Sequence, residues 1–281
     1  MNPSTLPDTL AIIAGKGAYP IVLAQSARAQ GVKRIYALAF RGETDRALAR
    51  LVDQVDWIYV GQLGAMLERL QASGARVAVM AGQITPTNLF RVRMDRPMIE
   101  LLGRLRERNA DTIFGAIGDE LGKAGITLQP ASLFMESAMP APGQISRRTP
   151  TPEEQADIDL GLRVAKATSG LDIGQTVVIK RGTVLAVEAF EGTDAAIRRA
   201  GELGGKGAVV VKVAKRGHDM RFDIPVVGRH TLKTLRKAGV AALAVEAGRT
   251  ILLERELLVA EADQQGLCFL AVATDDTTGR D

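Results

Sequence analysis

The stretch "TLAIIAGKGAYPIVLAQSARAQGVKRIYALAF" (residues 9–40) contains a strand-like, a helix-like and a second strand-like pattern in succession. "TLAIIAG" is a short apolar run typical of a buried strand, and "RIYALAF" has the same character. Between them, "AYPIVLAQSARAQG" spaces its apolar residues as one face of a helix does and ends at Gly31. This order predicts a parallel sheet with helices packed on its faces.

The alternation continues to about residue 130. "QVDWIYVG" and "RVAVMAG" predict strands, "QLGAMLERLQASG" and "RPMIELLGRLRER" predict helices, and "ITLQPASLF" predicts a closing strand. A proline-rich stretch, "SAMPAPGQISRRTPTP", interrupts the pattern, and a second α/β pattern follows it. We therefore predict two α/β domains with a ligand crevice between them. They are a Rossmann-like domain with a mainly parallel sheet (1–136) and a C-terminal domain with the catalytic loop (151–281), joined by a linker (137–150).

The composition limits the class of ligand. The chain has 281 residues, 46% hydrophobic and 24% charged, as soluble globular proteins do. Its net charge of +4 favours anionic ligands or an anionic membrane surface, but it is too small to indicate nucleic acid. The single cysteine, Cys268, excludes an intrachain disulfide and indicates a reducing cytoplasm. We find neither a signal peptide nor an apolar run long enough to span a membrane.

Two glycine-containing turns follow predicted strands of the first domain. Gly15, Lys16 and Gly17 stand in "AGKGAYP", and Gly82 and Gln83 stand in "AGQITP". Ligands of open parallel sheets bind at the carboxyl ends of the strands, so these turns are predicted to bind a phosphate of a nucleotide or sugar nucleotide. The alternative is that the glycines only permit tight turns. "AGKGAYP" lacks the third glycine of a dinucleotide fingerprint.

Three carboxylates lie close together in the second domain, at Glu188, Glu191 and Asp194 around a predicted strand end. Such a group of oxygen ligands can hold a hard cation such as magnesium. The alternative is ordinary helix capping by Thr193 or Asp194.

The densest group of charges lies in "KVAKRGHDMRFDIPVVG" (residues 212–228). A diphosphate needs cationic partners, and its hydrolysis needs a carboxylate that holds a metal or orients water. The alternative is a solvated loop with incidental ion pairs, and His218 alone among basic neighbours is a weak candidate for a base. Besides His218, the candidates of this segment for catalytic roles are its charged residues Lys212, Lys215, Arg216, Asp219, Arg221 and Asp223.

Four segments in this order and spacing, "IAGKGAYP", "AGQITP", "GQTVVIKRGTVLAVEAFEGTDAAIRRAG" and "KVAKRGHDMRFDIPVVG", resemble the UDP-2,3-diacylglucosamine pyrophosphatase family of lipid A (lipopolysaccharide) biosynthesis in Gram-negative bacteria. The resemblance covers nearly the whole chain. It implies two α/β domains that hold the lipid product between them. It also implies a magnesium-dependent hydrolase that releases UMP and 2,3-diacylglucosamine 1-phosphate (lipid X).

The resemblance further implies that Asp223, in "RFDIPVVG", is essential. The family often has "PNQDMRFD" where this chain has "RGHDMRFD", so Arg216 and His218 are expected to matter less than the other charged residues of the segment. We predict that Asp223, Glu191 and Asp194 hold Mg²⁺. The predicted substrate-binding residues are Gly15, Lys16, Gly17, Gly82, Gln83, Lys180 and Thr193.

The expected partners are the acylated UDP-sugar and, because that substrate resides in a membrane, the cytoplasmic surface of the inner membrane, where the protein would be peripheral. No nucleic-acid partner is expected, and a homodimer is an open alternative to a monomer. A binding or carrier protein for an acylated sugar phosphate remains the rival function, and it would not need Asp223. A dinucleotide-dependent oxidoreductase is a third reading.

Overall fold

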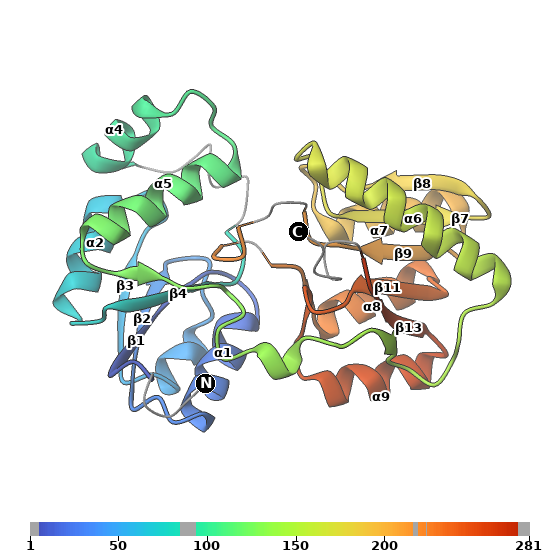
Figure 1. The fold of residues 1–281 in the computed structure, drawn as a ribbon, viewed down its shortest axis with the longest axis horizontal. Helices are drawn as coiled ribbons and strands as arrows, with labels where there is room; N and C mark the ends of the chain where they lie inside the picture. The colour runs from blue at the N-terminus through green and yellow to red at the C-terminus, as the bar shows by residue number, and fades with distance from the viewer. Residues whose placement is uncertain (1–5, 85–93, 216–218, 223, 275–281) are drawn as a thin grey trace. The chain divides into compact units, whose positions relative to one another are not determined.

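The computed structural model describes residues 6–84, 94–215, 219–222 and 224–274. They form two compact α/β units, each described here by itself (Figure 1). Unit 1 contains the described residues up to Met135 together with residues 219–222, and unit 2 contains the rest. The predicted class, two α/β domains with a mainly parallel sheet in the first, is confirmed.

Unit 1 is built on a five-stranded sheet in the order β3-β2-β1-β4-β5, with every neighbouring pair parallel. The chain runs outward from β1 to β3 and then crosses to the other side of β1 to form β4. The direction of the strand order therefore reverses between β1 and β4, which is where such sheets bind ligands. The strands are β1 (Thr9–Ala14), β2 (Arg34–Phe40), β3 (Gln54–Ile58), β4 (Val77–Ala81) and β5 (Thr127–Leu128).

Three helices of unit 1, α1, α2 and α4, form where the apolar spacing predicts them. One apolar core lies between the sheet and α2, α4 and α5, and includes Met66, Leu101 and Leu121. The predicted closing strand is shorter than expected, because turns follow Leu128. The helices are α1 (Tyr19–Ala29), the 3₁₀ helix η2 (Arg46–Arg50), α2 (Leu63–Ala72), α4 (Arg96–Arg104) and α5 (Ala110–Lys123).

Unit 2 is built on a six-stranded mixed sheet in the order β6-β13-β11-β9-β7-β8. Strands β13, β11 and β9 are parallel to one another, β7 pairs antiparallel with β9, and β8 pairs antiparallel with β7 in a hairpin. A short parallel pair, β10 with β12, lies apart from this sheet. The strands are β6 (Gly143–Gln144), β7 (Thr176–Lys180), β8 (Thr183–Val187), β9 (Val209–Lys212), β10 (Val226–Val227), β11 (Ala242–Glu246), β12 (Ile251–Leu252) and β13 (Cys268–Val272).

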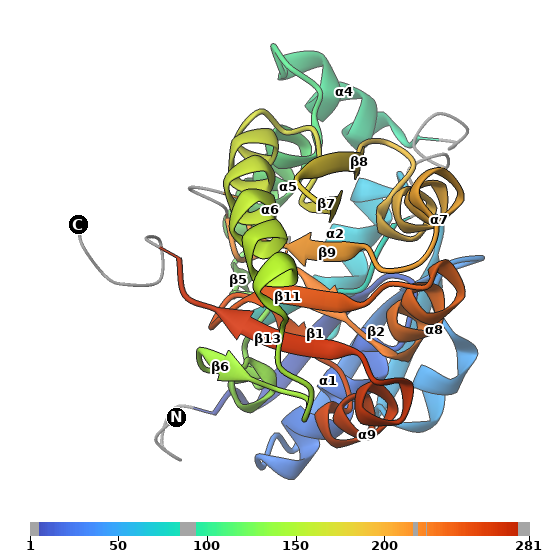
Figure 2. The same cartoon turned by 90° about the vertical axis from the view of Figure 1, so that its right-hand side faces the viewer.

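Helices cover both faces of this sheet, with α6 on one face and α7, α8 and α9 on the other (Figure 2). As the sequence predicts, α6 begins with Thr151 as its N-cap and Pro152 in its first turn, and Thr151 forms a capping box with Glu154. Sequence analysis did not predict α9. The helices are the 3₁₀ helix η3 (Glu136–Ala138), α6 (Pro152–Gly170), α7 (Thr193–Gly204), α8 (Arg229–Ala238) and α9 (Arg255–Gln265).

The segment predicted as a linker, residues 137–150, belongs to unit 2 and contributes its edge strand β6, which pairs antiparallel with β13. Arg148 fixes the end of this segment by donating two hydrogen bonds to Glu154, at 2.9 and 2.8 Å, and one to the carbonyl oxygen of Gly266. Such a two-pronged contact holds both charged groups in one orientation.

Candidate active site

The two predicted glycine turns of unit 1 meet at the point where the strand order reverses. The Gly15 N–H donates to the carbonyl oxygen of Ala81 at 2.7 Å, and Lys16 and Gln83 exchange backbone hydrogen bonds of 2.6 and 3.1 Å. A Cβ on Gly15 would lie 2.5 Å from the Gln83 carbonyl oxygen, and one on Gly82 would lie 2.6 Å from that of Lys16. The close approach of the two backbones therefore requires glycine at both positions.

This pairing corrects part of the predicted phosphate site. We expected the amides of Gly15, Lys16 and Gly17 to be available to a ligand, but the first two donate to the neighbouring turn. The exposed side chain of Lys16 and the exposed Gly17 lie at this edge of the sheet, immediately before α1. Lys16 and the N-terminus of α1 therefore remain available to a phosphate at this edge of the sheet, but fewer backbone amides are free than we predicted.

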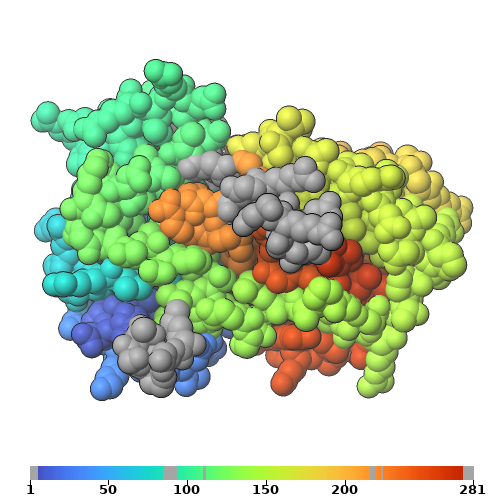
Figure 3. Space-filling view, in the orientation of Figure 1, coloured from blue at the N-terminus to red at the C-terminus, as the bar shows by residue number. Residues whose placement is uncertain are grey.

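Residues 219–222, which we assigned to the C-terminal domain, pack in unit 1. The Ala131 N–H donates to the carbonyl oxygen of Met220 at 2.7 Å. The ring of Phe222 stacks on that of Phe114 in α5, with centroids 5.9 Å apart and planes 28° apart. Figure 3 shows this orange segment against the green surface of unit 1. The chain therefore enters unit 1 a second time at the charged segment.

Arg221 and Asp219, both predicted to act on the diphosphate, bind each other. The Arg221 Nε donates to both carboxylate oxygens at 2.9 Å, and Nη2 donates to Oδ2 at 2.5 Å. The hydrogen bond that Arg221 donates to Asp219 raises the pKa of Arg221 above its ordinary value, so the guanidinium stays charged. The pair leaves Arg221 less positive toward an incoming anion than an unpaired arginine.

In unit 2, Ala214, which lies within the charged segment of residues 212–228, is fixed by a buried ion pair. Lys166 of α6 donates to both carboxylate oxygens of Glu246 at 2.8 Å, and Glu246 has no exposed surface. The Ala214 N–H donates to Glu246 at 2.7 Å, and its carbonyl oxygen accepts from Lys166 at 3.0 Å. The pair thus holds both backbone groups of Ala214. Sequence analysis missed it because its members come from two distant elements.

Lys212 and Lys215 lie at the same end of unit 2, close to the last residue of β9. Lys215 donates to Asp172 at 3.0 Å. Lys212 is buried, and its Nζ donates to the hydroxyl of Thr193 at 2.9 Å and to that of Thr176 at 3.4 Å. The structure therefore brings together Lys212 and Thr193, which we predicted as catalytic and substrate-binding residues, respectively.

The predicted metal ligands in the described part of the chain, Glu191 and Asp194, contact basic side chains. Glu191 accepts from Arg199 at 2.7 Å, and this contact lowers the pKa of Glu191. Asp194 pairs with His230 at 3.0 Å. Among the described residues, no three His, Cys, Asp or Glu side chains are grouped as metal ligands. Gly192, not Thr193 or Asp194, is the N-cap residue of α7.

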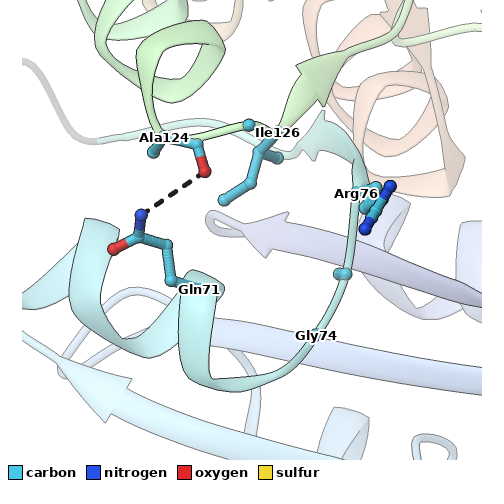
Figure 4. Close-up of a pocket in the computed structure, with 7 residues that line it drawn as sticks. Gln71, Gly74, Arg76, Ala124 and Ile126 are labelled. Atoms are coloured by element: carbon cyan, nitrogen blue, oxygen red, sulfur yellow. Dashed lines mark hydrogen bonds between the residues drawn. The ribbon is translucent and has the colours of Figure 1, made fainter.

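Asp223, with Arg216 and His218, lies outside the described residues. Lys180, predicted to bind substrate, donates to the Gly204 carbonyl oxygen at 2.5 Å at the hairpin end of β7. A hollow of about 490 Å³ in unit 1 lies where β4 and β5 begin, lined among others by Gln71, Arg76 and Ile126 (Figure 4). It contains none of the predicted site residues. No helix in the described ranges is long and apolar enough to cross a membrane.

Comparison with known families and proteins gives a consistent result. The family described as "LpxI N-terminal domain" matches residues 9–138, and "LpxI C-terminal domain" matches residues 141–270. The chain is similar to the UDP-2,3-diacylglucosamine pyrophosphatase LpxI of Caulobacter vibrioides, with 33% identity over 274 residues. The match covers 94% of this chain and 97% of that relative.

Solved structures show only distant likeness. The crystal structure of gox2253 has a TM-score of 0.35 and 13% identity, covering 94% of this chain and 77% of its own. The biotin carboxylase domain of the Hydrogenobacter thermophilus 2-oxoglutarate carboxylase has a TM-score of 0.29 and 12% identity. That match covers 70% of this chain and 41% of the other.

Proposed function

Because the chain belongs to the LpxI family, matched over residues 9–138 and 141–270, we propose that it is a UDP-2,3-diacylglucosamine pyrophosphatase. It hydrolyses the diphosphate of that substrate to UMP and 2,3-diacylglucosamine 1-phosphate, a step of lipid A biosynthesis. The observation that carries this proposal is the 33% identity over almost the full length of both proteins.

In the proposed reaction, a water oxygen forms a bond to the phosphorus nearer the sugar. The bond from that phosphorus to the bridging oxygen breaks, the bridging oxygen leaves with UMP, and the water gives up a proton. Asp223 is proposed to orient this water and accept its proton. Lys212 is proposed to offset the charge that develops on the phosphoryl oxygens, because Lys215 and Arg221 already pair with Asp172 and Asp219.

A divalent metal, proposed to be Mg²⁺, would offset charge on the diphosphate when bound. Of the residues predicted to hold it, Glu191 contacts Arg199 and Asp194 contacts His230, which does not fit a shared metal site. The metal proposal therefore rests on Asp223 and on the phosphate oxygens of the substrate.

The test is to incubate the purified protein with UDP-2,3-diacylglucosamine and Mg²⁺ in ¹⁸O-labelled water. We expect UMP to appear and the label to be found in the 1-phosphate of lipid X. Label in UMP would contradict the proposed attack on the phosphorus nearer the sugar. Absence of UMP with a folded protein that still binds the substrate would favour the carrier function instead.

We further propose that the protein acts at the cytoplasmic face of the inner membrane, because its substrate carries two acyl chains. The net charge of +4 favours an anionic surface. Sedimentation with phosphatidylglycerol vesicles, but not with phosphatidylcholine vesicles, is the expected result. A protein that sediments with neither kind of vesicle would contradict this location. The oligomeric state stays a prediction.

A further inference from the structure

Lys212 is a buried cation whose described partners are all neutral. The residue is 6% exposed, and its Nζ contacts the hydroxyls of Thr193 and Thr176. A buried lysine ordinarily pairs with a carboxylate, because an uncompensated charge away from water is costly. Among the described residues, no carboxylate lies within ion-pair distance of Lys212. The charge must therefore be compensated in another way.

The Thr193 hydroxyl connects Lys212 to a carboxylate. It lies 2.9 Å from the Lys212 Nζ and 2.8 Å from Oε1 of Glu188. An ammonium only donates and an ionised carboxylate only accepts, so the single Thr193 proton points to Glu188 and the Thr193 oxygen accepts from Lys212. Glu188 thus compensates the charge of Lys212 across one hydroxyl group, without using any of the donors of the ammonium.

Glu188 is held rigidly in this position. Its N–H donates to the Thr176 carbonyl oxygen at 2.8 Å, and Gly174 packs so closely that an added Cβ would lie 2.1 Å from the Glu188 carbonyl oxygen. Glu188 is 8% exposed, and its second carboxylate oxygen, Oε2, is buried without a hydrogen-bond partner in the described structure. A buried, unpartnered carboxylate oxygen destabilises a fold, so the charge of Glu188 carries a cost that its link to Lys212 must offset.

We propose that Glu188 is a positioning residue which, through Thr193, holds the Lys212 ammonium at the end of β9 ready to bind a phosphoryl group of the diphosphate. An ammonium has three donors, and the two hydroxyls occupy two of them, which leaves one for a phosphate oxygen. This inference rests on the proposed function. It adds how Lys212, one of the cations proposed to bind the diphosphate, is held in position.

The central test compares Glu188→Gln with the unmodified protein. The amide keeps the size and the accepting oxygen but removes the charge. We expect kcat/KM for UMP release to fall about ten- to a hundredfold, the usual effect of losing a hydrogen bond that involves a charged group. We expect Tm to change by no more than about 5 °C, since the relief of the unpartnered Glu188 oxygen offsets part of the lost compensation of the Lys212 charge. An unchanged kcat/KM would overturn the proposal.

A second pair of variants tests the same connection without altering Glu188, and so carries the test if Glu188→Gln does not fold. Thr193→Ser keeps the hydroxyl and should retain kcat/KM within about threefold, whereas Thr193→Val removes it and should match the loss in Glu188→Gln. Equal activity of the two variants would contradict the proposal.

A double-mutant cycle separates positioning from a general structural effect. If Glu188 acts through Lys212, then Glu188→Gln should lower kcat/KM by less than about twofold in a Lys212→Met background. If instead the two losses multiply, Glu188 acts independently of Lys212 and the proposal is wrong.

Failure of this inference is distinguishable from failure of the proposed function. If the unmodified protein releases no UMP, calorimetric titration with inorganic pyrophosphate still tests the arrangement. We then expect the unmodified protein to bind pyrophosphate at least about tenfold more tightly than Glu188→Gln. Equal affinities would overturn the inference whatever the substrate is.

Discussion

The ring of Phe222 stacks on the ring of Phe114 at a centroid distance of 5.9 Å, and this contact inserts the segment of residues 219–222 into the apolar core of unit 1. Asp223, the residue on which hydrolysis is proposed to depend, directly follows Phe222 in the chain. The residue that directly precedes the proposed catalytic carboxylate is therefore packed against the core of unit 1.

We expect Phe222→Ala to lower kcat/KM at least about tenfold, because the residue before Asp223 would no longer stack on Phe114. The free energy of unfolding should fall by about 1–2 kcal/mol, less than for a fully buried phenylalanine because this ring is half-buried. Steady-state UMP release and urea unfolding measure the two effects.

Phe114→Ala removes the same contact from α5 and serves as the partner variant, since it leaves residues 219–223 unchanged. It should lower both quantities as well. Full activity in both variants would show that the stacked pair does not position the segment.

Asp223→Asn should lower kcat at least about a hundredfold, the range of a general base, while Tm stays within about 2 °C. The matched control is Asp159→Asn, which removes the same charge from the exposed face of α6 and should leave kcat unchanged. An Asp223→Asn protein with more than a tenth of the normal kcat would contradict the assigned role.

Gly15→Ala should destabilise the protein by about 1–3 kcal/mol, because its Cβ would lie 2.5 Å from the Gln83 carbonyl oxygen and force the two turns apart. KM for the substrate should rise as well if the reversal between β1 and β4 binds the UDP group. Gly103→Ala is the control: it meets nothing within 4 Å and should stabilise α4 slightly. An unchanged KM in Gly15→Ala would remove this edge from the proposed site.

Glu154 gives a prediction for the dependence of stability on pH. Burial raises the pKa of Glu154, but the hydrogen bonds from Arg148 and from the Thr151 backbone outweigh it and lower that pKa below its ordinary value. A lowered pKa means that the folded form binds the proton less readily than the unfolded form. The stabilisation is complete above about pH 4.3, the ordinary value, and is lost as the pH falls through the lowered one.

Glu154→Gln should therefore be less stable than the unmodified protein at pH 7, and the difference should shrink as the pH falls below about 4. Urea unfolding at several pH values measures it. Parallel profiles for Glu154→Gln and the unmodified protein would mean that the Arg148 contact adds nothing to acid stability.

Local patterns in the sequence predicted most of the strands and helices, because the spacing of apolar residues depends on the geometry of a single element. The same patterns could not assign Phe222 to unit 1. Both units are α/β structures with apolar cores, and nothing in "DMRFD" itself states which core the phenylalanine joins. The helix α9 was missed since it shows no clear apolar face, with only Leu258 and Ala262 buried in it.

The candidate site likewise has residues that the sequence indicates and contacts that only the folded structure shows. Charge density alone indicated Lys212, but its partners follow from the register of the sheet, in which Thr176 of β7 lies opposite Lys212 of β9. That pairing is a tertiary property and leaves no mark in the spacing of residues along the chain. Glu188 was recognised as one of three neighbouring carboxylates, yet its link to Lys212 through Thr193 required the folded structure.

The return of the chain into unit 1 has a consequence for biosynthesis. A ribosome makes the protein from its N-terminus, so the sheet and helices of unit 1 emerge long before Phe222, which follows β9 of unit 2. Until then Phe114 has no ring to stack on, and the N-terminal unit cannot complete its core during its own synthesis. A fragment that stops at Met135 would remain in that unfinished state. The core of unit 1 is therefore completed only after more than half of unit 2 has been synthesised. The segment that completes it, residues 219–222, directly precedes Asp223 in the chain.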